Sequence, residues 1–288
     1  MKSLSVIFPA FNEAGNIRAV VEDALWTVPK LAPIFEIIVV NDGSKDSTGE
    51  ICDRLAEEFS DVRVVHHPRN RGYGAALKSG IKLARHDLIF FTDADGQFDL
   101  SEVAALLEQT DAYDIVAGYR GRRQDPPHRL LFAWGWNILV RLVLGIKIRD
   151  VNCAFKVFNR HVFDRVQINS VGAMVNAEIF AQVSRFGMTV KEVRVSHFPR
   201  RHGKPTGGNP VVIIKAFREL IKIRRKCYTI TAVIRRVRRL QAARESCDQS
   251  IVTADPLVKE NISVGEQLSS SQSNSSVTVS IRLASKGA

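Results

Sequence analysis

Two carboxylates stand two positions apart in Asp93-Ala94-Asp95, directly after the apolar run 88–91. Side chains two positions apart at a strand end point to the same side, so this pair could hold one hard divalent cation. Mg²⁺ and Mn²⁺ prefer such oxygen ligands and bridge to substrate phosphates, and Gln97 could add a neutral oxygen or orient a bound water. We therefore predict Mg²⁺ or Mn²⁺ at Asp93, Asp95 and Gln97, although this spacing alone also suits an ordinary turn.

Three further polar segments follow apolar runs in the same way, at residues 9–13, 41–44 and 70–74. Open α/β sheets bind ligands at the carboxyl ends of their strands, so these segments and 93–97 are expected to converge on one crevice. Asp42 could accept a hydrogen bond from a ribose hydroxyl or a base N–H, although Asp-Gly-Ser is also good turn chemistry. The convergence carries more weight than any single motif.

The first 120 residues alternate short apolar runs with helical patterns, which is typical of a parallel α/β sheet. Ser47 and Glu50 have the spacing of a capping box that opens a helix. The predicted strands are 4–8, 35–40, 62–65, 88–91 and 115–117, and the predicted helices include 17–28, 75–84 and 100–107. We expect a Rossmann-like, mostly parallel sheet with helices on both faces.

Beyond Arg120 the pattern changes. Residues 130–144 are apolar and aromatic, as in a helix that lies along an interface, and a mixed α/β portion follows to about His197. A helix around 213–221 has one apolar and one basic side. We predict a domain over 1–210, made of a first part at 1–120 and a second part at 121–210. A basic amphipathic helical segment at 211–245 and a disordered tail at 246–288 complete the prediction.

The formal net charge of +11 is unevenly distributed, because residues 194–245 hold fifteen Lys or Arg against two Glu. Such a segment suits the phosphates of nucleic acid, of anionic lipid headgroups or of a phosphorylated acceptor, and a solvated basic tail is the plainer alternative. No apolar stretch reaches the ~20 residues of a membrane span. The four cysteines are far apart and no signal peptide opens the chain, so we expect a cytoplasmic protein, peripheral on the inner face of the membrane.

Taken in order, the motifs resemble those of the inverting family 2 glycosyltransferases, and among them the polyprenyl-phosphate enzymes similar to dolichol-phosphate mannose synthase. The resemblance runs from about Leu4 to Leu220. Its motifs are Pro9-Ala10-Phe11-Asn12-Glu13, Asn41-Asp42-Gly43-Ser44-Lys45-Asp46-Ser47, Asn70-Arg71-Gly72-Tyr73-Gly74, Asp93-Ala94-Asp95-Gly96-Gln97, Arg120, Asp150-Val151-Asn152-Cys153-Ala154-Phe155-Lys156 and Glu178.

This resemblance implies a GT-A fold and a metal at the Asp93–Gln97 motif. It also implies that the part at 1–120 binds a nucleotide-sugar donor and that the part at 121–210 binds the acceptor. It implies Arg120 and Arg129 near the phosphates, and it departs from the family where Asn41 replaces a commoner Asp and Ala133 a commoner Ser. Many relatives also have C-terminal membrane helices, which this sequence lacks. The implied nucleotide-sugar contacts are Pro9, Ala10, Phe11, Glu13, Asp42, Asp93, Ala94 and Arg120.

The acceptor decides whether the reaction needs a base. A lipid phosphate is largely ionised near neutral pH, and Arg200, Arg201 and Lys204 could position it. A sugar hydroxyl would instead need a carboxylate, for which Asp150 and Glu178 are the candidates beside the catalytic Asp95. Asp150 could equally fix the turn at 152–156, and Glu178 could be a partly exposed helix residue.

We favour transfer to a polyprenyl-phosphate-type lipid at an anionic membrane surface. A soluble or glycan hydroxyl acceptor is the alternative. Of other classes, a nucleotidyltransferase would normally carry a basic glycine-rich loop after the first strand, and a basic nucleic-acid- or membrane-binding protein without catalysis would not explain the four segments. We expect no nucleic-acid partner, and the sequence leaves open the sugar, the base, the acceptor and the oligomeric state.

Overall fold

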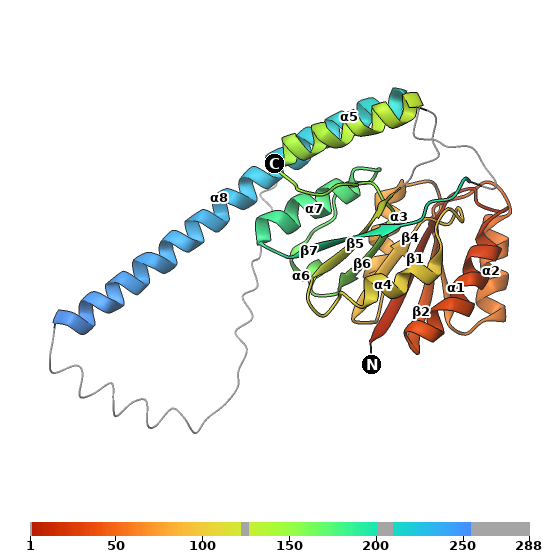
Figure 1. Ribbon diagram of the computed structural model, residues 1–288, viewed down its shortest axis with the longest axis horizontal. Coiled ribbons are helices and arrows are strands. Elements are labelled where there is room, and N and C mark those ends of the chain that lie inside the picture. The colour runs from red at the N-terminus through yellow and green to blue at the C-terminus, as the bar shows by residue number, and fades with distance from the viewer. Residues whose placement is uncertain (1, 122–126, 201–209, 255–288) are drawn as a thin grey trace, which may run out of the picture. The chain divides into compact units, whose positions relative to one another are not determined.

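The computed structural model describes residues 2–121, 127–200 and 210–254 (Figure 1). It divides into two compact units, Met1–Thr231 and Ala232–Ala288. The first unit contains all the strands and every predicted site residue that the structure describes.

One seven-stranded sheet has the order β3-β2-β1-β4-β6-β5-β7. Six strands run parallel, and β6 runs antiparallel to its neighbours β4 and β5. The strands are β1 (Ser3–Ala10), β2 (Ile34–Asn41), β3 (Val62–His66), β4 (Leu88–Thr92), β5 (Ile115–Arg120), β6 (Phe155–Asn159) and β7 (Val190–Val195). The predicted mostly parallel α/β sheet is confirmed.

Helices cover both faces of the sheet (Figure 1). Side chains alternate along β1, so that Val6 and Phe8 pack with α1 (Ile17–Leu31), α2 (Thr48–Glu58) and α4 (Val103–Leu107), while Ile7 packs on the opposite face. That opposite face carries α3 (Tyr73–Leu83), α5 (Pro127–Leu144), α6 (Val162–Arg165), α7 (Val175–Phe186) and the start of α8 (Pro210–Ala254).

The predicted strands and helices of the first 120 residues are present, with two differences of detail. The predicted helix over 100–107 begins as a 3₁₀ turn, Leu100–Glu102, before α4. The capping box is wrong, because the side chain of Ser47 makes no capping hydrogen bond. Asp46 takes this role instead, because its charged Oδ1 accepts from Thr48 N at 3.1 Å.

The predicted boundary at residue 210 does not separate two parts of the structure. Leu220, Ile223 and Cys227 of α8 are buried in the same core as Val140 of α5, so the first turns of α8 belong to the main unit. Helix α8 continues to Ala254, beyond the predicted start of the tail at 246, and the rest of that tail lies outside the described residues.

No helix among the described residues combines the length and the hydrophobicity that a membrane span needs.

Candidate functional site

The loop after β1 and the loop after β2 are bonded to each other at the carboxyl end of the sheet. Asn12 N donates to Ser44 Oγ at 3.0 Å, and Asn12 Oδ1 accepts from Lys45 N at 2.8 Å. Glu13 N donates to Thr48 Oγ1 at 2.9 Å. Asn12 has a left-handed backbone with φ of 56°, which Asn tolerates better than most residues. The two loops therefore form one rigid rim.

Asp42 joins the third loop to this rim. Its Oδ1 accepts from Arg71 N at 2.9 Å, its Oδ2 accepts from Gly72 N at 2.8 Å, and His67 Nδ1 lies 2.6 Å from Oδ1. Asp42 is only 3% exposed, so these three partners take up most of the hydrogen bonds that its carboxylate can accept. Asp42 shapes the 70–72 turn, and its predicted contact with a nucleotide stays a prediction.

The fourth loop carries the two carboxylates of the predicted metal site, directly after β4. Burial and the neighbouring charge of Asp95 raise the pKa of Asp93 to about 7. Burial also raises the pKa of Asp95, although the N–H of Gln97 and the guanidinium of Arg200 oppose that shift. Two adjacent buried carboxylates with raised pKa values form a site that a bound positive charge would stabilise.

Arg200, which follows β7, supplies part of that charge. Its Nη1 lies 3.9 Å from Asp95 Oδ2, and its Nη2 pairs with Glu13 Oε1. Gln97 ties the same segment to the fourth loop, because its Nε2 donates to the carbonyl of Phe198 at 2.8 Å. The amide of Gln97 thus has a positioning role in the structure, and its oxygen as a metal ligand remains a prediction.

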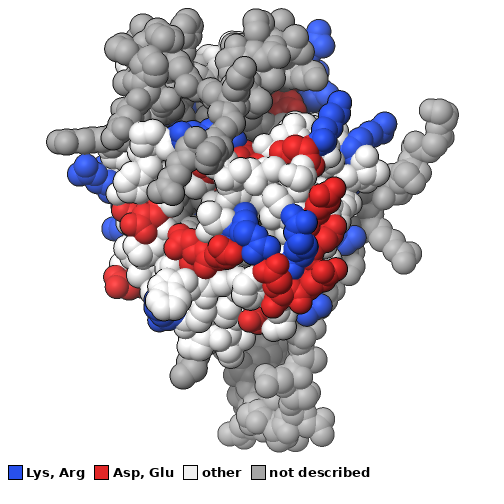
Figure 2. Space-filling view, turned by 90° about the vertical axis from the view of Figure 1, so that its right-hand side faces the viewer, with Lys and Arg blue, Asp and Glu red and all other residues white. Residues whose placement is uncertain are grey.

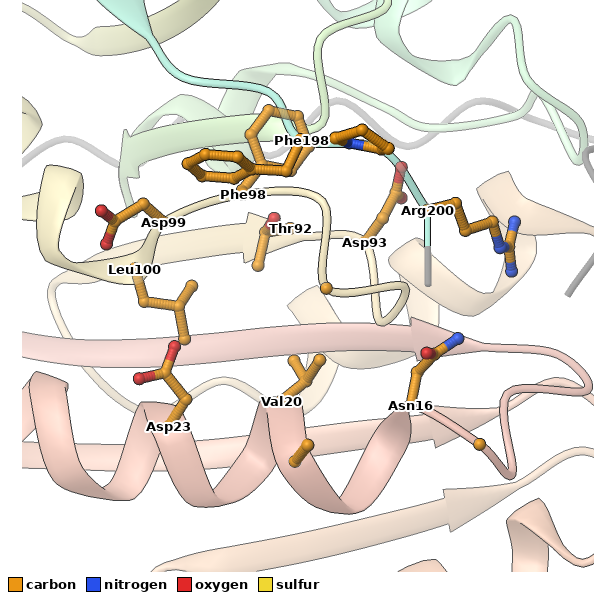
Figure 3. Close-up of a pocket in the computed structure, with 14 residues that line it drawn as sticks. Asn16, Val20, Asp23, Thr92, Asp93, Phe98, Asp99, Leu100, Phe198 and Arg200 are labelled. Carbon is orange, nitrogen blue, oxygen red and sulfur yellow. The ribbon is translucent and has the colours of Figure 1, made fainter. Parts of the chain in front are cut away.

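A cavity of about 790 Å³ opens beside these groups, between α1 and the segment 96–100 (Figure 3). Its volume lies within the range of about 300–1,000 Å³ that is usual for small-molecule sites. Asp93 and Arg200 lie at one end of its lining, near Asn16, and Asp23 lies toward the other end of α1 (Figure 3). Thr92, which also lines it, has a buried Oγ1 without a hydrogen-bond partner.

The carboxylate pair fits a divalent cation. Among the described residues no group of three His, Cys, Asp or Glu side chains is arranged to hold a metal. Asp93 and Asp95 would therefore supply two oxygens and leave several positions for phosphates and water, which is how Mg²⁺ is commonly held. The buried hydroxyl of Tyr73, next to Asp93 and without a well-formed hydrogen bond, adds a polar group at the same place.

Arg120 and Asp150 bind each other. Arg120 Nε and Nη2 donate to Asp150 Oδ2 and Oδ1 at 2.7 and 2.8 Å. Burial alone would raise the pKa of Asp150, but these bonds outweigh it and hold that pKa below its ordinary value. A carboxylate held in this way is a poor proton acceptor, which counts against Asp150 as a general base. Arg120 also acts on Asp93 by its charge, and its place near the phosphates stays a prediction.

Glu178 is buried rather than partly exposed, and four donors surround it. Its Oε2 accepts from Ser170 N at 2.7 Å and Asn169 N at 2.9 Å, while its Oε1 accepts from Asn169 Nδ2 and from Lys226 Nζ. Burial would raise the pKa of Glu178, and these donors lower it overall. These bonds hold the 169–172 segment, whose Val171 carbonyl accepts from Gly74 N at 2.9 Å. They count against Glu178 as a base, a role that stays a prediction.

The remaining predicted residues divide into four groups. Pro9, Ala10 and Ala94 are buried and can offer only backbone to a ligand, whereas Phe11 is 38% exposed at the rim. The side chain of Arg129 in α5 is not among those described. Arg201 and Lys204 lie outside the described residues.

Sequence analysis missed Lys156 as a site residue. It is fully buried, its Nζ donates to the carbonyl of Cys153 and to Asn176 Oδ1, and burial lowers its pKa to about 8. Its charge acts on Asp93. The signal was present in the printed motif, since a lysine within the apolar run of β6 is rarely buried without a purpose.

The family model described as "Glycosyl transferase family 2" matches residues 5–167. Glycosyltransferase AglD from Haloferax volcanii is 34% identical over 207 residues, which cover 68% of this chain and 33% of AglD. Undecaprenyl-phosphate 4-deoxy-4-formamido-L-arabinose transferase from Aeromonas hydrophila is 30% identical over 213 residues, covering 72% of this chain and 64% of that protein. The chain thus spans about a third of the first relative and under two thirds of the second.

Among solved structures, glucosyl-3-phosphoglycerate synthase from Mycobacterium tuberculosis, in complex with Mn²⁺, uridine diphosphate and glucosyl-3-phosphoglycerate, has the same fold. The match has a TM-score of 0.58 and 18% identity, and it covers 77% of this chain and 80% of that one. At this identity the likeness establishes the fold.

Proposed function

The chain belongs to glycosyl transferase family 2, and from this premise we propose that it transfers a sugar from a nucleotide-sugar to a polyprenyl-phosphate-type lipid. The observation that carries the proposal is the buried pair Asp93 and Asp95, with raised pKa values, at the carboxyl end of β4 and next to Arg200. A nucleotide-sugar is the substrate whose departing diphosphate such a pair can hold through a divalent ion.

The donor would bind across the rim that the first three loops form, with its diphosphate toward Asp93 and Asp95. Mg²⁺ or Mn²⁺ held there would neutralise charge on the departing nucleoside diphosphate, worth several kcal/mol of transition-state stabilisation. Arg120, fixed by Asp150, is oriented to add a second cation to the same region. We propose that the carboxylate of Asp95 is essential for transfer.

The acceptor oxygen would attack the anomeric carbon from the side opposite the diphosphate, so the bond to the acceptor forms as the bond to the diphosphate breaks. The product would have the inverted anomeric configuration. A phosphate oxygen needs no base, since it is already largely ionised above its second pKa of about 6. Arg200, with Arg201 and Lys204 of the next segment, would orient it.

Two observations favour a phosphate over a hydroxyl acceptor. Both carboxylates that the sequence offered as bases are committed to cations, Asp150 to Arg120 and Glu178 to Lys226. The Aeromonas relative is named for an undecaprenyl-phosphate acceptor. Transfer to a soluble or glycan hydroxyl stands as the second candidate, because other carboxylates line the cavity, Asp23 and Asp99 among them.

We further propose that the chain works at an anionic membrane surface, on its inner face, where a polyprenyl phosphate would be met. The basic residues of α8 support this location, because each Lys or Arg near such a surface contributes about 1 kcal/mol of binding.

The test is transfer itself. Purified chain with Mn²⁺ and radiolabelled UDP- or GDP-sugars is offered undecaprenyl phosphate in detergent or a panel of soluble hydroxyl acceptors. We expect label in the lipid fraction, none with Asp95→Asn, and a product whose anomeric configuration by NMR is inverted. Label only in the soluble acceptors would replace the lipid-phosphate proposal with the second candidate. Undiminished transfer by Asp95→Asn would contradict the assigned metal site.

A further inference from the structure

Large apolar side chains are exposed on α5 and on the part of α8 that belongs to the main unit. They are Trp134 at 64% and Leu142 at 75% exposed on α5, and Phe217 at 44%, Ile221 at 55% and Tyr228 at 66% on α8. Soluble monomers expose single apolar residues often, but large contiguous groups mark a binding surface. We call these five residues the apolar face.

The spacing places each group on one side of its helix. In α5, Trp134 and Leu142 are eight residues apart with half-buried Ile138 midway, which at 100° per residue makes one stripe. In α8, Phe217, Ile221 and Tyr228 follow the i, i+4, i+11 pattern of another stripe. The neighbouring stripe of Leu220, Ile223 and Cys227 is buried in the core, so α8 is anchored while this second apolar stripe is left uncovered.

The two stripes belong to neighbouring helices. The rings of Trp136 on α5 and Phe217 on α8 meet edge to face at 5.0 Å between centroids. Arg224 Nη1 of α8 donates to the carbonyl of Val143 on α5 at 2.6 Å, and its guanidinium lies 5.5 Å from the Tyr228 ring. These contacts hold the helices side by side, so that the apolar face draws on both.

The charges around the apolar face are mostly positive. Within residues 134–144 and 216–231, six side chains are basic and one, Glu219, is acidic. The exposed basic residues are Arg141, Arg218, Lys222, Arg224 and Arg225. By contrast, Figure 2 shows Lys and Arg side by side with Asp and Glu on the side of the molecule at the right of Figure 1, where α1 and α2 lie. There Arg18 pairs with both Glu22 and Glu58.

We infer that the apolar face of α5 and α8 is the surface by which this chain lies on an anionic bilayer. Trp and Tyr favour the headgroup level, the aliphatic side chains enter the acyl boundary, and Lys and Arg reach the lipid phosphates. A second copy of the chain fits poorly, because a two-fold interface would set the same basic residues against each other. The inference rests on the proposed function, which needs the chain at a membrane, and it names the surface that does the binding.

The experiment is co-flotation of the purified full chain with two kinds of vesicle. One is phosphatidylcholine alone, and the other also contains roughly one third phosphatidylglycerol, which gives the surface a negative charge. We expect binding to the anionic vesicles, weakened by salt, and at least tenfold weaker partitioning for Leu142→Gln with Ile221→Gln. The matched control is Ile34→Gln, since Ile34 on β2 is 52% exposed and far from these helices in the sequence. It should bind as wild type.

A second variant tests the charges. Arg218→Gln, Lys222→Gln and Arg225→Gln together should weaken binding to anionic vesicles at least tenfold, because each basic residue contributes about fivefold. Arg54→Gln, Lys78→Gln and Lys82→Gln, which remove exposed charges from α2 and α3, serve as the control. Equal binding by all variants would overturn the inference. So would a wild-type chain that does not bind vesicles but forms a dimer in sedimentation velocity, if Ile221→Gln dissociates that dimer.

Transfer to undecaprenyl phosphate in detergent does not require binding to a vesicle, so this activity tests the proposed function separately from the membrane-binding surface. The Leu142→Gln, Ile221→Gln variant should keep that activity while losing vesicle binding. Wild type that binds vesicles through this face but transfers no sugar would refute the proposed function and leave the inference standing.

Discussion

Arg200 Nη1 lies 3.9 Å from Asp95 Oδ2, while its Nη2 pairs with Glu13. One guanidinium thus connects the segment after β7 with the loop after β1 and with the carboxylate pair after β4. It places a fixed positive charge where a divalent cation and a phosphate are proposed to meet. The same charge should therefore repel the first and attract the second.

Replacing this arginine should separate those two effects. We expect Arg200→Met to bind Mn²⁺ about three- to tenfold more tightly, because a nearby like charge is lost and Glu13 is released. The KM for the lipid-phosphate acceptor should rise about tenfold or more, because a charge-assisted contact is lost. Calorimetric titration with Mn²⁺ and steady-state kinetics measure the two quantities, with Arg54→Met as the exposed control. Weaker metal binding would contradict the geometry.

The raised pKa of Asp93 predicts how stability depends on pH without metal. Its folded-state value of about 7 exceeds the ordinary 3.8, so between these values the folded chain binds a proton more strongly than the unfolded chain. The contribution of Asp93 to the free energy of unfolding therefore falls as pH rises from about 4 to about 7. Asp93→Asn, which cannot ionise, should become more stable than wild type by about 1–3 kcal/mol across that window.

Chemical denaturation at pH 5 and pH 7.5, in the presence of a chelator, gives this difference. Mn²⁺ should then stabilise wild type at pH 7.5 and have little effect on Asp93→Asn. Asp61→Asn, an exposed carboxylate with no such environment, is the control. A constant difference between wild type and Asp93→Asn at both pH values would contradict the prediction.

Asn41 stands where the motif resemblance leads us to expect an aspartate, and both ends of its amide have partners. Its Oδ1 accepts from Ser44 N at 3.0 Å, and its Nδ2 lies 3.0 Å from His66 Nδ1. His66 Nε2 in turn lies 2.8 Å from Asp53 Oδ1. An amide can donate to Nδ1, and the Nε2–H of the same ring can then donate to Asp53.

In Asn41→Asp the amide N–H that faces His66 Nδ1 would be lost, while the acceptor for Ser44 N would be retained. We expect this variant to be about 1 kcal/mol less stable than wild type in urea, because one hydrogen bond between the end of β2 and the end of β3 is lost. Transfer activity should stay within about threefold. Stability equal to that of wild type would mean that this hydrogen bond is absent in solution.

Much of the fold followed from the sequence. Buried parallel strands are continuous apolar runs, as in Ile37–Val40 of β2, and polar residues such as Asp42 and Asp93 end them at one edge of the sheet. The antiparallel β6 and its position between β4 and β5 were not predicted individually. Its pairing joins residues far apart in the chain, Phe91 with Lys156 for example, and local periodicity contains no information on such partners.

The sequence leaves more open about the site than about the fold, for a physical reason. Residue type shows that Glu178 and Asp150 are carboxylates, but whether a carboxylate is a base depends on which cations fold against it. Lys226 reaches Glu178 from 48 positions away, and Arg120 reaches Asp150 from 30. Only the folded chain reveals these partners.

The Glu178 contacts predict a loss of stability rather than of a proton acceptor. In Glu178→Gln the amide has only one acceptor oxygen, so it cannot bond all four donors, and Lys226 loses its charged partner. We therefore expect the free energy of unfolding in urea to fall by about 2–4 kcal/mol. Glu57→Gln, at an exposed position on α2, should change stability by less than about 0.5 kcal/mol. At temperatures where the variant is folded, its pH–rate profile should match that of wild type. A lost acid limb would restore Glu178 as a base.

Asp150 allows the corresponding test at the reaction itself. Its pKa lies below the ordinary value, so a base at this position would be active far into the acidic range. A phosphate acceptor should instead give kcat/KM an acid limb near pH 6, where its second proton is lost. With saturating Mn²⁺, Asp150→Asn should lower kcat/KM about 10- to 100-fold, because Arg120 loses its bidentate partner, and keep that limb in place.

Arg120→Lys provides the matched comparison, since it keeps the charge but cannot form the two parallel bonds to Asp150. It should show a similar fall in kcat/KM and the same limb near pH 6. If instead Asp150→Asn abolished the limb while Arg120→Lys retained it, Asp150 would be accepting a proton from the acceptor. A hydroxyl acceptor would then replace the lipid phosphate, because an ionised phosphate has no proton that the reaction must remove.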